Sequence, residues 1–162
     1  MKGLSSKEIK IVSWLELENK RFFTRNNIKR FFKNKNEMNV YIYKLKSKKR
    51  IIRINKNKYY LIPIKAYKDK WSEHPFIIID EIFNGKDYLI GGKAAAYYWK
   101  YIEQIPTEID VYSIKKQGSK KFFNIKINFI RTSKKNMKEF VIKKIKNHKF
   151  AIANKKKASK WK

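Results

Sequence analysis

The first part of the chain carries the apolar spacing of two helices. Ser5 or Ser6 is placed to cap a helix that runs to about Asn19. Its apolar stripe is formed by Ile9, Val12, Leu15 and either Ile11 or Trp14. Thr24 then caps a short second helix, in which Ile28, Phe31 and Phe32 share one face. Each pattern predicts a helix with one side turned to a core.

A third helix and a hairpin follow. The helix begins near Asn36 and places Met38, Ile42 and Leu45 on one side. Its other side is polar and carries Asn39, Tyr43, Lys46 and Arg50. After Arg50 the period changes to two, in I-I-R-I and Y-Y-L-I around N-K-N-K, which predicts a β-hairpin with an Asn-rich turn tolerant of positive φ. Three helices and a basic hairpin predict a winged helix-turn-helix domain over residues 1–62.

The remainder alternates between helix and strand patterns. Residues 63–75 are polar and framed by prolines, which predicts a linker. Beyond it, helices are expected at 76–83 and 93–101, and strands at 88–90, 109–113 and 122–129, with two more in F-V-I-K-K-I and K-F-A-I-A. The pattern predicts a small α/β domain with a mixed sheet over residues 76–162, ending in a basic tail. The whole chain is therefore expected to be α+β.

Composition narrows the function classes. The 162 residues are 43% hydrophobic and 15% aromatic, enough for a folded core. With no cysteine and two histidines, a zinc site is not expected, and we predict neither metal nor cofactor. The longest uncharged apolar run, Ala94 to Trp99, is too short to span a membrane, and the first ten residues lack the apolar segment of a signal peptide. A cytoplasmic location without a membrane partner is expected.

The formal charge of +29 is unevenly distributed. Residues 1–62 carry +14, residues 63–114 carry −2 and residues 115–162 carry +17. Separate clusters of cations bind polyanions by releasing counterions, so two phosphate-facing surfaces are indicated. For any single lysine, a solvated surface position is the simpler interpretation.

The predicted winged helix gives these cations a docking geometry. In such a domain the third helix enters the major groove, so its polar residues Asn36, Asn39 and Tyr43 would reach base edges. Arg53, Lys56 and Lys58 of the hairpin would follow a neighbouring phosphate backbone. The same surface is completed by Thr24, Arg25, Lys46 and Arg50, and a second basic surface is indicated at Lys120, Lys121 and Arg131. A winged helix used for protein contact is the alternative.

The segment around Gly91-Gly92 permits an enzymatic interpretation. Glycines between a strand and a helix, followed by acidic residues in a strand, are typical of nucleotidyltransferases, whose carboxylates hold Mg²⁺. Glu108 and Asp110 are such a pair, but Glu139 is the sole acid after them. The residues fit a structural role better: a tight strand-to-helix turn followed by an alanine-rich helix packed on the sheet. We therefore predict no enzyme activity.

The order of three segments resembles the AbiEi family of antitoxins and transcriptional regulators. They are L-K-S-K-K-R-I-I-R-I-N-K-N-K-Y-Y-L from residue 45, Y-L-I-G-G-K-A-A-A-Y-Y-W from residue 88 and Q-I-P-T-E-I-D-V-Y-S from residue 104. The resemblance implies a repressor of its own operon and the antitoxin of a type IV toxin-antitoxin pair, with a nucleotidyltransferase-like toxin encoded beside it. The expected partners are operator DNA with repeated half-sites, that toxin and a second copy of the chain. A non-specific nucleic-acid-binding protein remains the other alternative.

Overall fold

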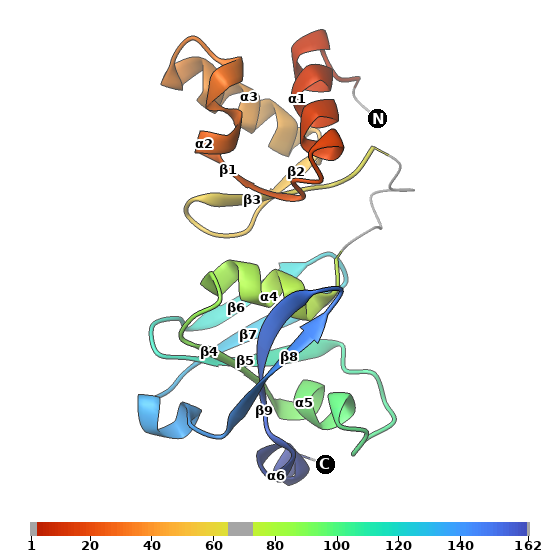
Figure 1. The fold of residues 1–162 in the computed structure, drawn as a ribbon, viewed down its shortest axis with the longest axis vertical. Coiled ribbons are helices and arrows are strands. Elements are labelled where there is room, and N and C mark those ends of the chain that lie inside the picture. The colour runs from red at the N-terminus through yellow and green to blue at the C-terminus, as the bar shows by residue number, and fades with distance from the viewer. Residues whose placement is uncertain (1–2, 65–72, 162) are drawn as a thin grey trace. The chain divides into compact units, whose positions relative to one another are not determined.

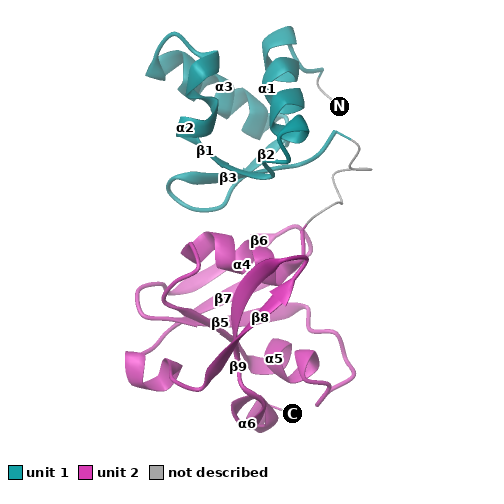
Figure 2. Ribbon diagram, viewed as in Figure 1, with its two compact units in different colours: residues 1–72 teal, residues 73–162 magenta. Residues whose placement is uncertain are grey.

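The chain divides into two compact units, residues 1–72 and 73–162 (Figures 1 and 2). The structure is a computed structural model that describes residues 3–64 and 73–161. Within these ranges the fold is α+β, with six α-helices, a three-stranded sheet in the first unit and a mixed six-stranded sheet in the second. Residues 65–72 of the predicted linker lie outside the described residues, and Pro75 at its end begins a helix.

The first unit alternates helices with short strands. Its elements are α1 (Ser6–Leu17), β1 (Phe22–Thr24), α2 (Arg25–Ile28) with a 3₁₀ turn at Lys29–Phe31, α3 (Lys35–Ser47), β2 (Ile51–Arg53) and β3 (Lys58–Leu61). The strand order is β1-β3-β2, and both pairings are antiparallel. The expected order of three helices and a hairpin is therefore present, with β1 as an added strand.

Helix α1 begins where its sequence satisfies its free N–H groups. The Ser5 hydroxyl accepts from the Glu8 N–H, and the Glu8 carboxylate accepts from the Ser5 N–H at 2.6 Å, which forms a capping box. The buried side is formed by Glu8, Ile11, Val12 and Leu15. Ile9, predicted to lie on that side, is 47% exposed. That prediction was wrong because Ile9 and Ile11 cannot share a narrow stripe, and Ile11 fits the core.

One hydrophobic core joins the three helices to the sheet. Met38, Ile42 and Leu45 of α3 are buried, as their spacing predicts. They belong to a cluster that also contains Ile11, Val12, Leu15, Phe23, Ile28, Ile51, Tyr59 and Leu61. Burying this much apolar surface fixes α3 against α1 and β3, and leaves the opposite side of α3 outside the core.

The second unit is built on the mixed sheet. Its elements are α4 (Pro75–Phe83), β4 (Tyr88–Gly91), α5 (Gly92–Tyr98), β5 (Glu108–Ser113), β6 (Gly118–Phe122), β7 (Ile125–Arg131), β8 (Phe140–Ile145), β9 (His148–Ala153) and α6 (Lys155–Ala158). The strand order is β6-β7-β5-β4-β9-β8. Strands β5 and β7 pair in parallel, as do β4 and β9, and the other three pairings are antiparallel. The predicted mixed sheet is confirmed.

Helices cover both sides of this sheet, with α4 drawn above the strands and α5 and α6 below them in Figure 1. The Phe83 ring of α4 packs on Tyr88 and Phe129, at centroid distances of 5.2 and 5.8 Å. The opposite side of β5 faces α5 through Asp110. Helices α4 and α5 therefore pack on opposite sides of the sheet, against its central strands.

The strand expected over residues 122–129 is instead a tight hairpin. Phe123 has a φ of 52°, and Phe122 pairs with Ile125 across the turn. Ile127 and Phe129 are buried in β7, whereas Phe123 lies in the turn. The continuous alternation of apolar and polar residues concealed the turn, because Phe123 adopts a left-handed conformation that normally favours Gly or Asn.

Candidate nucleic-acid interface

The exposed side of α3 presents polar groups near its start and middle. Asn34 caps the helix, and its Oδ1 accepts from the Glu37 N–H at 2.9 Å. Asn36 and Lys46 are exposed, and Tyr43 is 71% exposed. These three side chains are free to meet a surface that approaches α3.

Two predicted contact residues are less accessible than the three named above. Arg50 follows the end of α3 and is only 8% exposed, so its assignment to the outer face was wrong. Asn39 is half-buried, and its Oδ1 is buried without a hydrogen-bond partner among the described residues. Asn39 lies between Asn36 and Tyr43 on the same side of α3, so its contact with DNA stays a prediction, whereas the chain after Ser47 carries Arg50 inward.

The β2–β3 hairpin has a turn organised by side chains. The Asn55 Oδ1 accepts from the N–H groups of Asn57 and Lys58, both at 3.0 Å. Arg53 donates to the backbone oxygens of Asn55 and Lys56, both at 3.1 Å. The expected positive φ is not used at any of these residues, because the Asn55 side chain satisfies the turn instead. Lys56 is exposed at the tip, while Arg53 uses part of its guanidinium to hydrogen-bond the turn.

Thr24 and Arg25 stand where β1 enters α2. The Thr24 N–H and hydroxyl both donate to Asn27 Oδ1, at 2.7 and 3.0 Å. The Arg25 Nε lies 3.4 Å from the Tyr59 hydroxyl of β3. Thr24 also pairs with Lys58 in the sheet, so the start of α2 and the hairpin lie side by side.

A basic hollow lies between α2 and the start of α3. Its volume is about 380 Å³, and its lining combines four cations with two amides and two apolar side chains: Arg25, Lys29, Lys33, Lys35, Asn26, Asn34, Phe32 and Met38. Apart from Arg25, the sequence interpretation missed these residues as site residues. Their signal was present in the sequence as basic residues at a spacing of four, Arg25, Lys29 and Lys33, which a helical turn brings to one side.

The carboxylate of Glu37, beside this hollow, is compensated by a neighbouring positive charge. The Glu37 carboxylate accepts from Lys7 Nζ at 2.5 Å and from the Lys33 N–H at 2.9 Å. These hydrogen bonds, the one from Lys7 foremost, hold the pKa of Glu37 below its ordinary value. Glu37 is therefore ionised and paired with cations, and the hollow keeps its positive character.

In the second unit, the candidate catalytic carboxylates are already partnered. Asn128 Nδ2 donates to Glu108 Oε2 at 2.9 Å and to Asp110 Oδ1 at 3.1 Å, and Lys126 Nζ lies 2.9 Å from Glu108 Oε1. The hydrogen bonds from Asn128 and then Lys126 lower the pKa of Glu108. Among the described residues, no three acidic or histidine side chains are grouped to hold a metal ion.

The Gly91-Gly92 turn is shaped by close packing. A Cβ on Gly92 would lie 2.4 Å from Asp110 Oδ2, and Gly92 has a φ of +60°. A Cβ on Gly91 would lie 2.6 Å from the Tyr112 ring. Both glycines therefore have a structural role, because the Asp110 carboxylate and the Tyr112 ring fill the space beside them.

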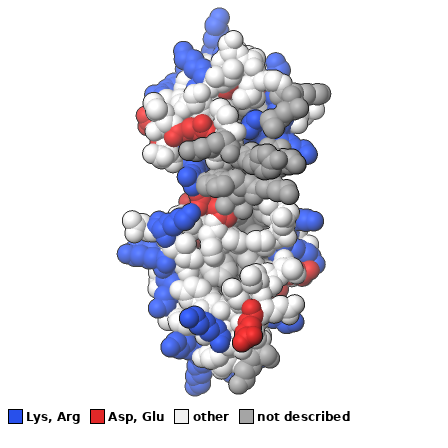
Figure 3. All heavy atoms as spheres, turned by 90° about the vertical axis from the view of Figure 1, so that its right-hand side faces the viewer, with Lys and Arg blue, Asp and Glu red and all other residues white. Residues whose placement is uncertain are grey.

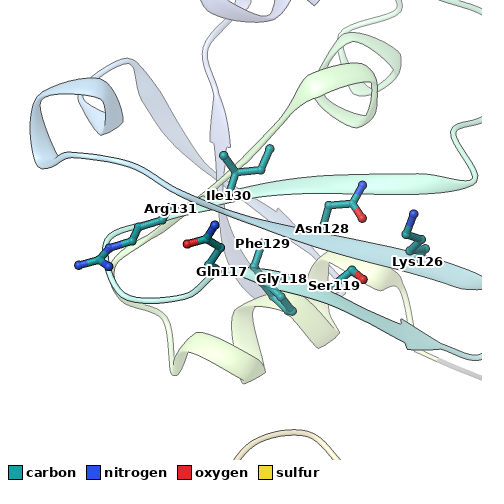
Figure 4. A pocket seen from close by; sticks show the side chains of 8 residues that line it. All are labelled: Gln117, Gly118, Ser119, Lys126, Asn128, Phe129, Ile130 and Arg131. Carbon is teal, nitrogen blue, oxygen red and sulfur yellow. The ribbon is translucent and has the colours of Figure 1, made fainter.

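The second predicted basic surface is dispersed. Lys120 and Lys121 are consecutive in β6, so their side chains leave opposite sides of the strand. Arg131 lines a different feature, an open pocket of about 580 Å³ between β6 and β7, with Lys126 at its other end and Asn128 between them (Figure 4). Lys121 stands opposite Lys126 in the β6–β7 register, so these two lysines share one side of the sheet, while Lys120 lies opposite Ile127 on the other side.

Positive charge is not confined to these sites. Lys and Arg side chains are spread over the visible face of both units, with few Asp and Glu among them (Figure 3).

No helix of the described residues is long and apolar enough to cross a membrane. No family model matches the chain, and no curated protein is significantly similar to it.

Proposed function

We propose that this chain is a sequence-specific DNA-binding regulator whose first unit is a winged helix-turn-helix domain. The order α1, β1, α2, α3, β2, β3 with an antiparallel β1-β3-β2 sheet supports this proposal. The observation that carries it is the basic hollow lined by α2 and the start of α3, the helix that also exposes Asn36, Tyr43 and Lys46. Specific DNA recognition has two components. Cations position a helix on the phosphates, and polar groups read the bases.

In this proposal α3 enters the major groove. Asn36, Tyr43 and Lys46 face the base edges, since all three are exposed on one helix. Arg25, Lys29 and Lys33 bind the phosphates that border the groove, and Lys56 follows a neighbouring backbone from the hairpin tip. Asn39 lies half-buried on the same side of α3 as Asn36 and Tyr43, and the buried Arg50 does not touch DNA.

We extend the proposal to a biological role through the AbiEi resemblance. The chain would repress its own operon and act as the antitoxin of a type IV pair, with a nucleotidyltransferase-like toxin encoded beside it. The carboxylate pair has no catalytic role in this proposal; its hydrogen bonds with Asn128 and its ion pair with Lys126 link β5 to β7. A nucleotidyltransferase-like reading frame next to this gene is the expected observation.

The experiment that tests DNA reading compares two duplexes. DNA from upstream of the gene and a random duplex of equal length are titrated with the full chain, and binding is followed by fluorescence anisotropy. The upstream duplex should bind at least about a thousandfold more tightly at physiological salt. Equal affinities would replace the proposal with a non-specific nucleic-acid-binding protein.

Variants separate reading from positioning. Tyr43→Ala should weaken the upstream duplex by about 1 to 3 kcal/mol and the random duplex much less, since a lost base contact affects specific binding alone. Lys29→Ala or Lys56→Ala should weaken both duplexes equally and lower the slope of log K against log salt by about one unit.

Lys10→Ala is the matched control, because Lys10 is an exposed lysine of α1 outside the hollow and the hairpin. It removes the same charge and should leave the salt slope nearly unchanged. If Lys10→Ala acted like Lys29→Ala, binding would depend on total charge and not on the hollow.

A further inference from the structure

The six-stranded sheet has two edges of different chemistry. At one end, β6 presents Gly118, Ser119, Lys120 and Lys121, all exposed and none of them apolar. At the other end, β8 exposes two large apolar side chains, with Phe140 46% and Ile142 54% exposed. Glycine and lysine are common means of protecting a sheet edge from further pairing, whereas exposed apolar residues favour it. Edge β6 carries nothing apolar among these exposed residues, whereas edge β8 combines Lys143 and Lys144 with two exposed apolar side chains.

The backbone of β8 also faces outward at defined positions. The Asn154 N–H donates to the Glu139 carbonyl at 3.1 Å, and β8 and β9 continue in that antiparallel register. Paired and outward residues alternate along such a ladder, so Val141, Lys143 and Ile145 bond to β9. The N–H and C=O groups of Ile142 and Lys144 therefore point away from the sheet.

The turn of the hairpin confirms this alternation. Lys146 and Asn147 have φ values of 48° and 63°, the geometry of a two-residue type I′ turn. Such a turn is flanked by a hydrogen-bonded pair, here Ile145 and His148. Within the described residues β8 is the last strand of its sheet, so its outward groups are available to another strand.

The charge around this edge identifies the kind of strand that fits it. The segment from residue 134 to residue 149 contains seven lysines and one glutamate. Two copies of a chain with a net charge of +29 would repel each other across such an edge. An acidic segment would be attracted, and its own apolar residues would cover Phe140 and Ile142.

We propose that the outer edge of β8 is a docking site for an extended acidic segment of a partner protein, which joins the sheet as an additional strand. Main-chain hydrogen bonds to Ile142 and Lys144 set the register, as in other cases of strand addition. Apolar residues at alternate positions of the segment pack on Phe140 and Ile142, and its carboxylates lie on the other side of the sheet, where Lys143 projects. A nucleic acid has no strand edge to pair with β8 and gains little from Phe140 and Ile142. The site is independent of the proposed DNA-binding surface.

A designed peptide tests this proposal on the full chain. The probe is a fluorescein-labelled peptide that alternates glutamate with valine or isoleucine over eight residues, and binding is measured by anisotropy. The first control is the same peptide with alternate backbone amides N-methylated, which keeps charge and side chains but removes strand pairing. The second replaces each glutamate with lysine. Both controls should bind at least about tenfold more weakly, and absence of binding by the first peptide overturns the proposal.

Protein variants locate the site. Ile142→Pro removes an outward N–H without touching a β8–β9 hydrogen bond, so the sheet should survive while peptide affinity falls at least about tenfold. The double variant Lys143→Glu/Lys144→Glu should cause a similar loss by reversing the local charge. Circular dichroism and thermal unfolding establish that each variant is folded, and the N-methylated peptide gives the same test on the unchanged protein if the proline variant does not fold.

The matched control lies on the opposite edge of the sheet. Lys120→Glu/Lys121→Glu makes the same change of charge on β6 and should leave peptide affinity within about twofold. Equal losses from the two double variants would show non-specific attraction and overturn the proposal. It would also be overturned if a random duplex bound edge β8 in preference to the peptide, or if Ile142→Pro abolished self-association measured by light scattering, which would make a second copy the occupant.

Discussion

At the scale of single residues, Glu8 connects two helices of the first unit. Its Oε2 accepts from the Ser5 N–H and from Lys48 Nζ, both at 2.6 Å, and its side chain is fully buried. Burial by itself would raise the pKa of Glu8. The hydrogen bonds from Lys48 and Ser5 and the charge of Lys48 outweigh burial and lower it. The carboxylate is therefore held ionised between the start of α1 and the end of α3.

Glu8→Gln should destabilise the first unit by about 1 to 3 kcal/mol at pH 7, because a charge-assisted hydrogen bond is lost in a buried place. A lowered pKa contributes stability above the ordinary value of 4.5 and loses it as the pH falls through the folded value. The difference between wild type and variant, measured by urea denaturation, should therefore be large at pH 7 and shrink below about pH 4.

The exposed pair of Lys20 and Glu18, 3.2 Å apart, provides the control. Glu18→Gln should change the free energy of unfolding by less than about 0.5 kcal/mol, because exposed pairs contribute little. A Glu8→Gln effect as small as this would mean that Lys48 and Glu8 do not form a stabilising pair.

A second residue-scale prediction concerns Tyr60, whose side chain is buried in β3. Burial raises the pKa of Tyr60 to about 12, against which the charge of Arg21 acts weakly. Between about pH 10 and 12 the unfolded chain ionises this phenol while the folded chain does not, so stability falls as the pH rises. This group alone should give a slope of about 1.4 kcal/mol per pH unit.

Tyr60→Phe should reduce that alkaline slope, measured as the free energy of unfolding from pH 9 to 12. Tyr43→Phe is the comparison, since the Tyr43 side chain is 71% exposed and its hydroxyl stays in water in both states. Identical slopes for the two variants would contradict the prediction.

At the scale of elements, the turn between β4 and α5 determines how closely that helix packs on the sheet. Gly92 combines a positive φ with a space that Asp110 already fills. Gly118 has a φ of +105°, and among the described residues nothing lies within 4 Å of the place where its Cβ would stand. A substitution at Gly118 is strained only in its backbone. One at Gly92 must also displace a carboxylate that Asn128 holds at 3.1 Å.

Gly92→Ala should therefore cost about 2 to 3 kcal/mol of stability, and Gly118→Ala about 1 to 2 kcal/mol. Gly3→Ala, at an open position, should have almost no effect. Chemical denaturation of the three variants measures the free energy of unfolding that each substitution costs. In an Asp110→Ala background the cost of Gly92→Ala should fall, because the side chain that blocks the new methyl group is gone. An unchanged cost would mean that backbone strain, and not the contact, decides the requirement for glycine.

At the scale of the whole molecule, each unit has its own core and its own sheet. Phe76, Tyr98 and Phe150 pack together within the second unit, with ring centroids 5.2 to 6.1 Å apart, while the first unit closes around Tyr59 and Phe23. Residues 115–162 nevertheless carry more positive charge than residues 1–62. Under the proposed function, the first unit therefore supplies the sequence preference, and the second unit adds electrostatic attraction to DNA.

Expressed separately, residues 1–64 and 73–162 should each unfold cooperatively on heating. The first piece should keep its preference for upstream over random DNA within about threefold of the full chain, which is less than 1 kcal/mol. It should lose affinity for both duplexes equally, because the charge of the second unit is absent. Anisotropy titrations of the piece and the full chain provide the measurement. A collapse of the preference itself would show that the second unit takes part in reading the operator.

The sequence by itself determined the elements with a clear period. The stripes of α1 and α3, the β2–β3 hairpin and the strands β5, β8 and β9 follow from local spacing, since a helix or strand face is fixed by residues a few positions apart. Its charge counts also separated two basic regions from a neutral one. Tertiary structure decided what local spacing cannot specify. It buried Arg50, turned the chain at Phe123, gathered Arg25, Lys29 and Lys33 around one hollow, and placed Asn128 between two carboxylates 18 and 20 residues away. Burial and side-chain hydrogen bonds depend on how the elements pack, and the turn at Phe123 depends on its backbone conformation, so neither follows from the period within one element.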